Sequence, residues 1–304
     1  MKALPITLCA ALILASCAPA QVPAQTAATN VATPAEWVAA CADAPEGRDG
    51  WVVPAPATRV FGNTYMVGTC GIMALLVVTD DGAVLVDSGM PEAAPLVAAN
   101  IAQVGVRLAD VKWLLSSHEH LDHVGATAEL QRMTGAQTAA LEPARQPLQT
   151  GEPWPFDPQA SIIPRFTGFA IDRVLPDGGS ITLGGTTFTA HSTPVHTPGS
   201  TSWTWQSCEG GTCRTISYMD SLSTPAADDY RFTDHPDYVA GVRAAFAKAA
   251  AVPCGMLFTP HPEASNLPAR LSGSAPLADP AGCAAYAAQG EANFTQRLAG
   301  EARP

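Results

Sequence analysis

The chain has 304 residues, of which 47% are hydrophobic and 14% are charged, a composition typical of a globular protein rather than a disordered one. Its formal net charge is −11, and Lys and Arg form no cluster, so nucleic acids and anionic membrane surfaces are not expected as partners. The length suits one large domain or two small ones, and no linker or strong repeat divides the sequence.

The first 20 residues have the features of an export signal. A lysine precedes an apolar stretch at residues 4–15 that is too short to remain across a bilayer. Two processing routes are open. Cleavage after Ala18-Pro19-Ala20 would release the protein, whereas acylation of Cys17, in the lipobox-like run Leu14-Ala15-Ser16-Cys17, would anchor it to a membrane.

These signals define the expected organisation of the chain. Residues 1–20 are the signal peptide, with a lipoprotein signal ending before Cys17 as the alternative. Residues 21–36 are expected to be a flexible segment, and residues 37–304 a single domain. We therefore predict a periplasmic protein, either free or lipid-anchored through Cys17, with no transmembrane helix in its mature form.

Six cysteines lie outside the signal region, an even number that agrees with an oxidising compartment. Cys208 and Cys213 flank a Glu-Gly-Gly-Thr turn between two strand-like runs, so we expect them to staple a hairpin. Zinc binding by this pair is disfavoured because no C-x-x-C spacing occurs. The other predicted disulfides are Cys254–Cys283, which flank a short strand and the loop after it, and, by elimination, Cys41–Cys70.

The predicted elements alternate between short apolar runs and longer helical segments. In the first half they are strands at 60–61, 65–67, 73–78, 83–86 and 111–115, helices at 91–104 and 122–133, and a long loop at 146–170. In the second half they are strands at 186–190, 203–207, 215–219 and 256–259 and helices at 236–251 and 280–298. This pattern predicts a layered α/β domain with two sheets inside and helices outside.

The most informative segment follows the predicted strand at 111–115, where the strand ends and a helix begins. His118 and His120 are two residues apart in an extended stretch and therefore point to the same side. Asp122 and His123 open the helix and can turn toward the same crevice. Clustered imidazoles and a carboxylate in a crevice require pairing or a cation, so these four residues indicate a metal site.

Further ligands must come from distant parts of the chain, because four-coordinate metal sites draw on separate loops. His196 and His261 lie in proline-braced loops after strands, which hold a side chain with little entropy to lose. His191 and His235 are expected to be hydrogen-bonded or solvated instead.

The His118-x-His120-x-Asp122-His123 pattern resembles the metallo-β-lactamase superfamily. Three further segments resemble its subclass B3: His196–Trp203, Asp220–Ser223, and Thr259–Pro262 with Ser265 and Asn266. The resemblance extends from Trp37 to the C-terminus. It implies an αβ/βα four-layer sandwich, with two central sheets flanked by helices and a site at one edge between the sheets.

The resemblance also implies two zinc ions and their ligands. The first zinc would be bound by His118, His120 and His196, and the second by Asp122, His123 and His261. Asp87 matches a family position that hydrogen-bonds near the metals, although capping the turn before residues 91–104 accounts for it equally well.

The ligand types indicate a mechanism. Three neutral imidazoles leave the first zinc with its full charge, so it can activate a bound water for attack on a lactam carbonyl, without a protein nucleophile. Asp122 is the expected catalytic residue because it can orient the hydroxide that this water becomes. The second zinc, with Ser221 and Ser223, would hold the substrate carboxylate and stabilise the leaving nitrogen. Glu119 has no role in this scheme and is expected to be a solvated loop residue.

Two assignments rest on position alone. Phe156, like Ile162 in the same long loop, is a candidate substrate contact. Asp220 lies in a segment where related thiolesterases and lactonases carry a metal-bridging aspartate. We favour a structural or hydrogen-bonding role near the metal, because Ser221 and the surroundings of His261 match the lactamase pattern better.

The sequence therefore predicts a metallo-β-lactamase that hydrolyses penicillins, cephalosporins and carbapenems and confers antibiotic resistance. The alternative enzyme is a lactonase or thiolesterase of the same fold, and a zinc-sequestering protein without turnover is the non-enzymatic alternative. The expected partner is a small-molecule β-lactam, and the expected oligomeric state is a monomer.

Overall fold

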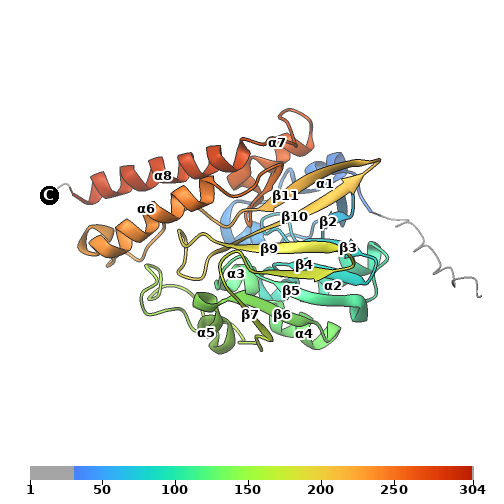
Figure 1. Cartoon of the computed structure of the whole chain (residues 1–304), viewed down its shortest axis with the longest axis horizontal. Helices are drawn as coiled ribbons and strands as arrows, with labels where there is room; N and C mark the ends of the chain where they lie inside the picture. Colours follow the sequence, from blue (N-terminus) through green and yellow to red (C-terminus); the bar gives the residue numbers. More distant parts are fainter. Residues whose placement is uncertain (1–30, 303–304) are drawn as a thin grey trace, which may run out of the picture.

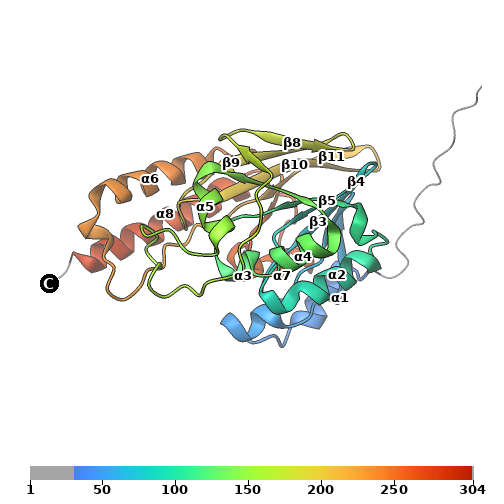
Figure 2. The same cartoon turned by 90° about the horizontal axis from the view of Figure 1, so that it is seen from below.

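Two β-sheets stacked face to face form the centre of the protein, with helices on both outer faces (Figures 1 and 2). The structure is a computed structural model that describes residues 31–302. The predicted signal peptide and Cys17 lie outside the described residues. Among residues 31–302, no helix combines the length and hydrophobicity needed to cross a membrane.

The first sheet has seven strands that lie side by side in chain order, β1 to β7. Strands β1 to β4 pair antiparallel, and β4 to β7 pair parallel. The strands are β1 (Thr58–Phe61), β2 (Thr64–Met66), β3 (Leu75–Thr79), β4 (Gly82–Val86), β5 (Val111–Leu115), β6 (Gln137–Leu141) and β7 (Arg173–Leu175). In β4, alternate side chains pack on opposite faces of the sheet, Val84 toward the second sheet and Leu85 toward the helices.

The second sheet has five strands in the order β12-β11-β10-β9-β8. Its strands are β8 (Ser180–Leu183), β9 (Thr186–Ser192), β10 (Thr201–Glu209), β11 (Thr212–Tyr218) and β12 (Met256–Phe258). All pairs are antiparallel except β11 with β12. Trp203 and Phe188 are fully buried between the two sheets, so this interface forms the main hydrophobic core.

Helices complete the four layers. Their bounds are α1 (Pro34–Cys41), α2 (Ala94–Gln103), α3 (Leu121–Val124), α4 (Thr127–Thr134), α5 (Glu142–Thr150), α6 (Pro236–Ala250), α7 (Leu267–Leu271) and α8 (Gly282–Glu301). Helices α2 and α4 pack on the first sheet through residues such as Ile101 and Leu130. Helices α6 and α8 pack on the second sheet, where Phe246 and Phe294 contact each other. The predicted αβ/βα sandwich is therefore confirmed.

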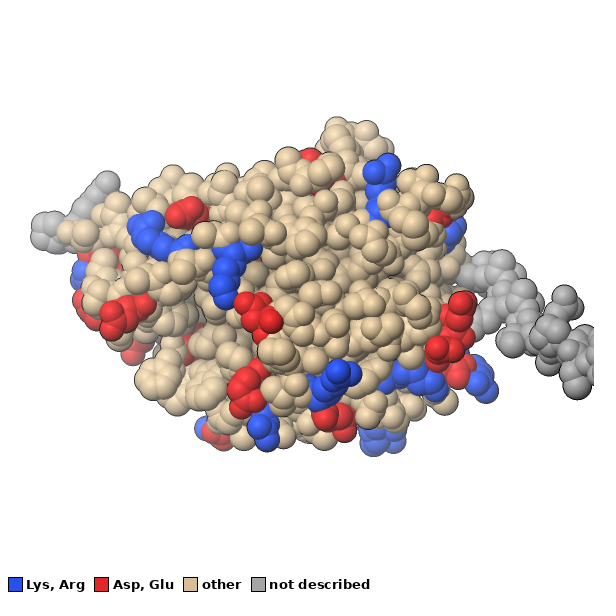
Figure 3. Space-filling model, in the orientation of Figure 1, with Lys and Arg blue, Asp and Glu red and all other residues tan. Residues whose placement is uncertain are grey.

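Charged side chains are sparse on the face shown in Figure 3, where Lys and Arg are scattered among Asp and Glu around the edges. This distribution agrees with the absence of a basic cluster in the sequence and gives this face no extended basic surface.

The structure corrects several predicted element boundaries. The predicted helix at 122–133 is divided into α3 and α4, because the amide of Ala126 donates to the carbonyl of Gly89. The predicted loop at 146–170 begins only after α5, which was not predicted as a helix because it contains two prolines. Strands β6, β7 and β8 were not predicted. They have three to five residues, and most of β6 is buried, so it lacks the alternation that marks a half-exposed strand.

The N-terminal boundary is also corrected, because ordered structure begins before residue 37. Ala32 pairs with Thr58, and α1 begins at Pro34, inside the segment predicted to be flexible. Thr33 and Glu36 form a reciprocal capping box at its start. The signal was available in the sequence, because Thr-Pro-Ala-Glu combines the capping-box spacing with a proline at the first helical position.

The three predicted disulfides are present: Cys41–Cys70, Cys208–Cys213 and Cys254–Cys283. Cys208 and Cys213 face each other across the β10–β11 hairpin, as the turn between them predicts.

Candidate metal centre

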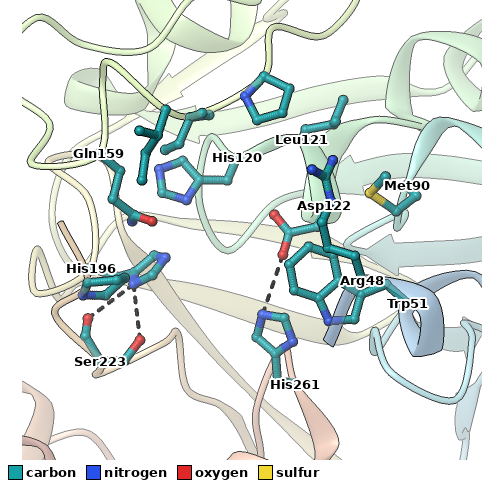
Figure 4. Close-up of a pocket in the computed structure, with 14 residues that line it drawn as sticks. Arg48, Trp51, Met90, His120, Leu121, Asp122, Gln159, His196, Ser223 and His261 are labelled. Atoms are coloured by element: carbon teal, nitrogen blue, oxygen red, sulfur yellow. Dashed lines mark hydrogen bonds and ion pairs between the residues drawn. The ribbon is translucent and has the colours of Figure 1, made fainter. Parts of the chain in front are cut away.

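Loops from both sheets meet at a cavity of about 300 Å³. The first sheet contributes residues 116–120 after β5, together with α3. The second contributes residues 193–200 between β9 and β10, and residues 259–261 after β12. These loops carry every histidine and the aspartate that the sequence nominates as metal ligands, and four of these residues line the cavity: His120, Asp122, His196 and His261 (Figure 4).

His118, His120 and His196 form the first group. One ring nitrogen from each lies within 4.8 Å of the others. Nε2 of His118 is buried and has no hydrogen-bond partner. A buried nitrogen without a partner is costly unless a cation occupies the space before it, so this atom fits a metal ligand.

Asp122, His123 and His261 form the second group, and their spacing is tighter. Nε2 of His123 lies 3.0 Å from Oδ2 of Asp122 and 3.2 Å from Nε2 of His261. Nε2 of His261 lies 3.4 Å from the same carboxylate oxygen. Ligand bonds of about 2.0–2.1 Å in a tetrahedral zinc site separate neighbouring donor atoms by about 3.3 Å. The second group therefore has the donor types and spacing that zinc requires.

In three of these imidazoles, the ring nitrogen that faces away from the group lies within hydrogen-bond distance of an oxygen atom, which orients the ring. Nδ1 of His118 lies 2.7 Å from Oδ1 of Asp220, and Nε2 of His120 lies 2.9 Å from Oδ2 of Asp157. Nδ1 of His196 donates to the carbonyl of Ser223 at 3.0 Å. Such contacts fix the ring orientation and leave the opposite nitrogen free to bind a metal.

Asp157 was missed by the sequence analysis. It lies in the long loop after α5, is only 3% exposed and also accepts a bond from the amide of Gln159. Nothing local distinguishes it from a loop aspartate, since its partner His120 is 37 residues away.

Asp87 holds the ends of three elements together beside His123. Its carboxylate accepts bonds from the amide and hydroxyl of Ser117 and from the hydroxyl of Tyr218, at 2.6, 2.7 and 2.7 Å. Oδ2 lies 3.4 Å from Nδ1 of His123. Asp87 has a φ of 61°, a conformation rare for residues other than glycine. The alternative capping role is wrong, because the helical turn after it begins at Pro91 with no side-chain cap.

Glu119 is not solvated, so the prediction for this residue was wrong. It is 1% exposed, and its carboxylate accepts bonds from the hydroxyl of Thr197 at 2.8 Å and the amide of Gly199 at 2.9 Å. A Cβ on Gly199 would lie 2.5 Å from this carboxylate, so the contact depends on glycine. Burial raises the pKa of Glu119 to about 7. Glu119 thus ties the loop of His118 and His120 to the loop of His196.

Electrostatics at the site agree with metal ligation. Burial and the neighbouring imidazoles lower the pKa of His118 and, to about 3, that of His196, so both rings are neutral as a ligand must be. Burial opposes ionisation of Asp122, but His123 and His261 outweigh it and hold the pKa of this carboxyl well below its usual range. Burial likewise opposes protonation of His123, but Asp122 and Asp87 raise its pKa to about 10. Without a cation, His123 therefore carries a proton that a metal would displace.

The remaining predicted residues differ in their access to the cavity. Ser223 lines it, whereas Ser221 is 5% exposed and lies outside the lining. Ile162 lines the cavity, but Phe156 is 73% exposed and lines a separate hollow beside Tyr230. Arg48, Trp51 and Gln159 also line the cavity, although no sequence motif marked them as site residues.

The two histidines expected to lie outside the metal groups do so. Nε2 of His191 lies 2.9 Å from the hydroxyl of Thr204, and His235 stacks on Tyr230.

Comparisons with known proteins agree with this description. Residues 67–209 match the metallo-beta-lactamase superfamily. Metallo-β-lactamase MIM-1 from Novosphingobium pentaromativorans is 52% identical, with a TM-score of 0.86, and the match covers 88% of this chain and 98% of that chain. MEM-A1, a subclass B3 metallo-β-lactamase from a soil metagenome library, is 39% identical, with a TM-score of 0.78 and coverage of 83% and 98%.

A more distant similarity is to a hydroxyacylglutathione hydrolase from Anaeromyxobacter dehalogenans. It is 32% identical over 124 residues, which are 41% of this chain and 38% of that protein. The chain thus spans well under half the length of this curated relative. Because the solved relatives are matched over nearly their whole length, the chain belongs to the metallo-β-lactamase superfamily and, within it, to the subclass B3 group.

Proposed function

We propose that this protein hydrolyses the β-lactam amide bond of penicillins, cephalosporins and carbapenems with the help of two zinc ions, and so confers antibiotic resistance. The observation that carries the proposal is the pair of adjacent three-residue groups at the cavity, each with zinc-type donors. The proteins that match this chain at 39% and 52% identity are themselves named metallo-β-lactamases.

The proposed ligands follow the two groups. His118, His120 and His196 would hold one zinc, and Asp122, His123 and His261 the other. Zinc bound there supplies Lewis-acid chemistry and lowers the pKa of water toward neutrality.

Asp122 is the proposed catalytic residue. It is the one carboxylate among the lining residues within the described part of the chain. Its low pKa keeps it ionised, so it can accept a hydrogen bond from the attacking water and orient that water toward the lactam carbonyl. A second oxygen on the same carboxylate remains available while the first faces His123 and His261.

Groups at one end of the cavity suit the carboxylate common to β-lactams. The hydroxyl of Ser223 and the amide of Gln159 both line it, and Nε2 of Gln159 is buried without a partner. A buried donor without an acceptor favours a ligand that brings an oxygen to it. Ser221, which precedes Ser223 by two residues and is 5% exposed, is the proposed second donor, and Phe156 is a proposed contact for substrate side chains.

We also propose a monomer exported to the periplasm. The three disulfides support an oxidising compartment. Mass spectrometry of the mature N-terminus would distinguish cleavage after Ala20 from acylation at Cys17.

The second candidate function is thioester hydrolysis, which the similarity to a hydroxyacylglutathione hydrolase raises. One purified preparation should be assayed with imipenem, an acyl-homoserine lactone and a glutathione thioester, with and without a chelator. We expect chelator-sensitive imipenem hydrolysis that serine-directed acylating inhibitors do not affect. A kcat/KM about a hundredfold higher for the thioester or lactone, equal to about 2.7 kcal/mol of transition-state binding, would overturn the lactamase proposal.

A further inference from the structure

Among lysines and arginines, Arg48 is the one residue that lines the cavity within the described part of the chain. It lies in the short 3-10 helix Gly47–Val52, which precedes β1. The protein has a formal net charge of −11, so its overall charge repels anions. Arg48 is the one lysine or arginine of the described lining that can attract an anion to the cavity.

The backbone beneath Arg48 is firmly attached to the protein. The carbonyl of Trp51 accepts a bond from Thr69 at 2.8 Å, and the carbonyl of Val53 accepts one from the amide of Cys70 at 2.9 Å. Cys70 is in turn joined to α1 through its disulfide. The ring of Trp51 packs on His261 with the centroids 5.4 Å apart. The arginine side chain therefore extends from a fixed base beside the second proposed metal group.

The guanidinium itself is uncommitted. No ion pair or side-chain hydrogen bond of Arg48 forms within residues 31–302, whereas Arg107 and Arg132 each pair with an acidic neighbour. Asp122, the lining carboxylate, is instead engaged with His123 and His261. An exposed arginine with all its donors free suits a carboxylate, which it can bind through two parallel hydrogen bonds.

Arg48 lies at the opposite end of the cavity from Ser223. Figure 4 shows Ser223, His196 and Gln159 on one side, with Arg48, Trp51 and Met90 on the other. A bicyclic β-lactam carries its common carboxylate beside the lactam nitrogen and its acylamino side chain on the far side of the lactam ring. If Ser223 faces that carboxylate, as the proposed function holds, the acylamino side chain extends toward Arg48.

We propose that Arg48 and Trp51 form a subsite for an anionic, aromatic acyl side chain, so that the enzyme prefers β-lactams with a second carboxylate on that chain. The proposal rests on the proposed function. Trp51, Met90 and Leu121 supply apolar surface for an aromatic ring, and Arg48 supplies the charge at its edge.

The test uses two penicillins that differ by one carboxylate, benzylpenicillin and its α-carboxy derivative carbenicillin. The kcat/KM of each is measured for the zinc-loaded wild type, Arg48→Gln, Arg48→Lys and the control Arg132→Gln, which removes the same charge from α4. We expect Arg48→Gln to lower the ratio of carbenicillin to benzylpenicillin about tenfold, which corresponds to about 1.4 kcal/mol. Arg48→Lys should restore part of the ratio, and Arg132→Gln should leave it unchanged.

Ionic strength provides an independent readout. Raising the salt concentration should reduce the carbenicillin preference of the wild type but not that of Arg48→Gln, because exposed charges are screened. A ratio that stays within twofold in Arg48→Gln would overturn the subsite. Calorimetric binding of the two penicillins to each variant separates the two proposals. Arg48-dependent binding without any hydrolysis would overturn the proposed function alone, and hydrolysis with equal preference in all variants would overturn the subsite alone.

Discussion

Glu119 offers the sharpest test of how the site is braced, because its carboxylate joins two ligand-bearing loops. Glu119→Ala removes the acceptor for both Thr197 and Gly199. Thr197 keeps a second partner in the hydroxyl of Ser200 at 3.2 Å, but the buried amide of Gly199 loses its acceptor. Glu119→Gln keeps the shape of the side chain and one acceptor oxygen, so it is the conservative control.

The magnitude follows from these contacts. An unsatisfied buried amide costs about 1–3 kcal/mol. Removing a buried carboxylate offsets part of this, since burial already disfavours its charged form. We therefore expect Glu119→Ala to lower the free energy of unfolding by about 2 kcal/mol, and Glu119→Gln to stay within about 1 kcal/mol of the wild type. Loosening the loop of His196 should also weaken the first zinc site by about 10- to 100-fold.

Two measurements check this reasoning. Urea denaturation of the zinc-free protein gives the free energy of unfolding, and competition with a chromophoric chelator gives the affinity for each zinc. Glu129→Ala, which removes an exposed partner of Arg132 on α4, is the matched surface control. A Glu119→Ala variant that unfolds like the wild type and binds zinc equally well would refute the bracing role of Glu119, as would a Glu119→Gln variant that is as damaged as Glu119→Ala.

Three further predictions follow from the same geometry. Asp122→Ala should retain the fold but lose the second zinc and most turnover, and metal analysis that finds two tightly bound zincs would refute the ligand assignment. Replacing Cys254 and Cys283 together by serine removes a disulfide that joins residues 29 apart in the sequence. By the loop-entropy relation this should lower the free energy of unfolding by about 3–4 kcal/mol, and a denaturation curve identical to that of the wild type would contradict this. In Gly199→Ala the new Cβ would lie 2.5 Å from the carboxylate of Glu119 and 2.7 Å from Cα of Ala144. This overpacking should destabilise the protein by about 1–3 kcal/mol, and a thermal melt identical to that of the wild type would disprove it.

The metal-binding chemistry of the site could be predicted from short segments of sequence. His118, His120, Asp122 and His123 lie within six residues at the end of a buried strand, and local chain geometry alone brings them to one crevice. The hairpin disulfide was likewise local. The layered fold could be predicted from apolar runs long enough to show a period. A strand as short as β7 is too short to show one, and in α5 the two prolines argued against a helix.

Only the tertiary structure decided which polar residues support those ligands. Asp220 reaches His118 across 102 residues of sequence, and Glu119 is buried because Thr197 and Gly199, about 80 residues later, close over it. Arg48 reaches the cavity because a disulfide-linked N-terminal segment packs beside His261. Side-chain type and spacing report on local geometry, but the burial and partners of a loop residue depend on distant segments that pack against it. Local sequence patterns carry no information about those contacts.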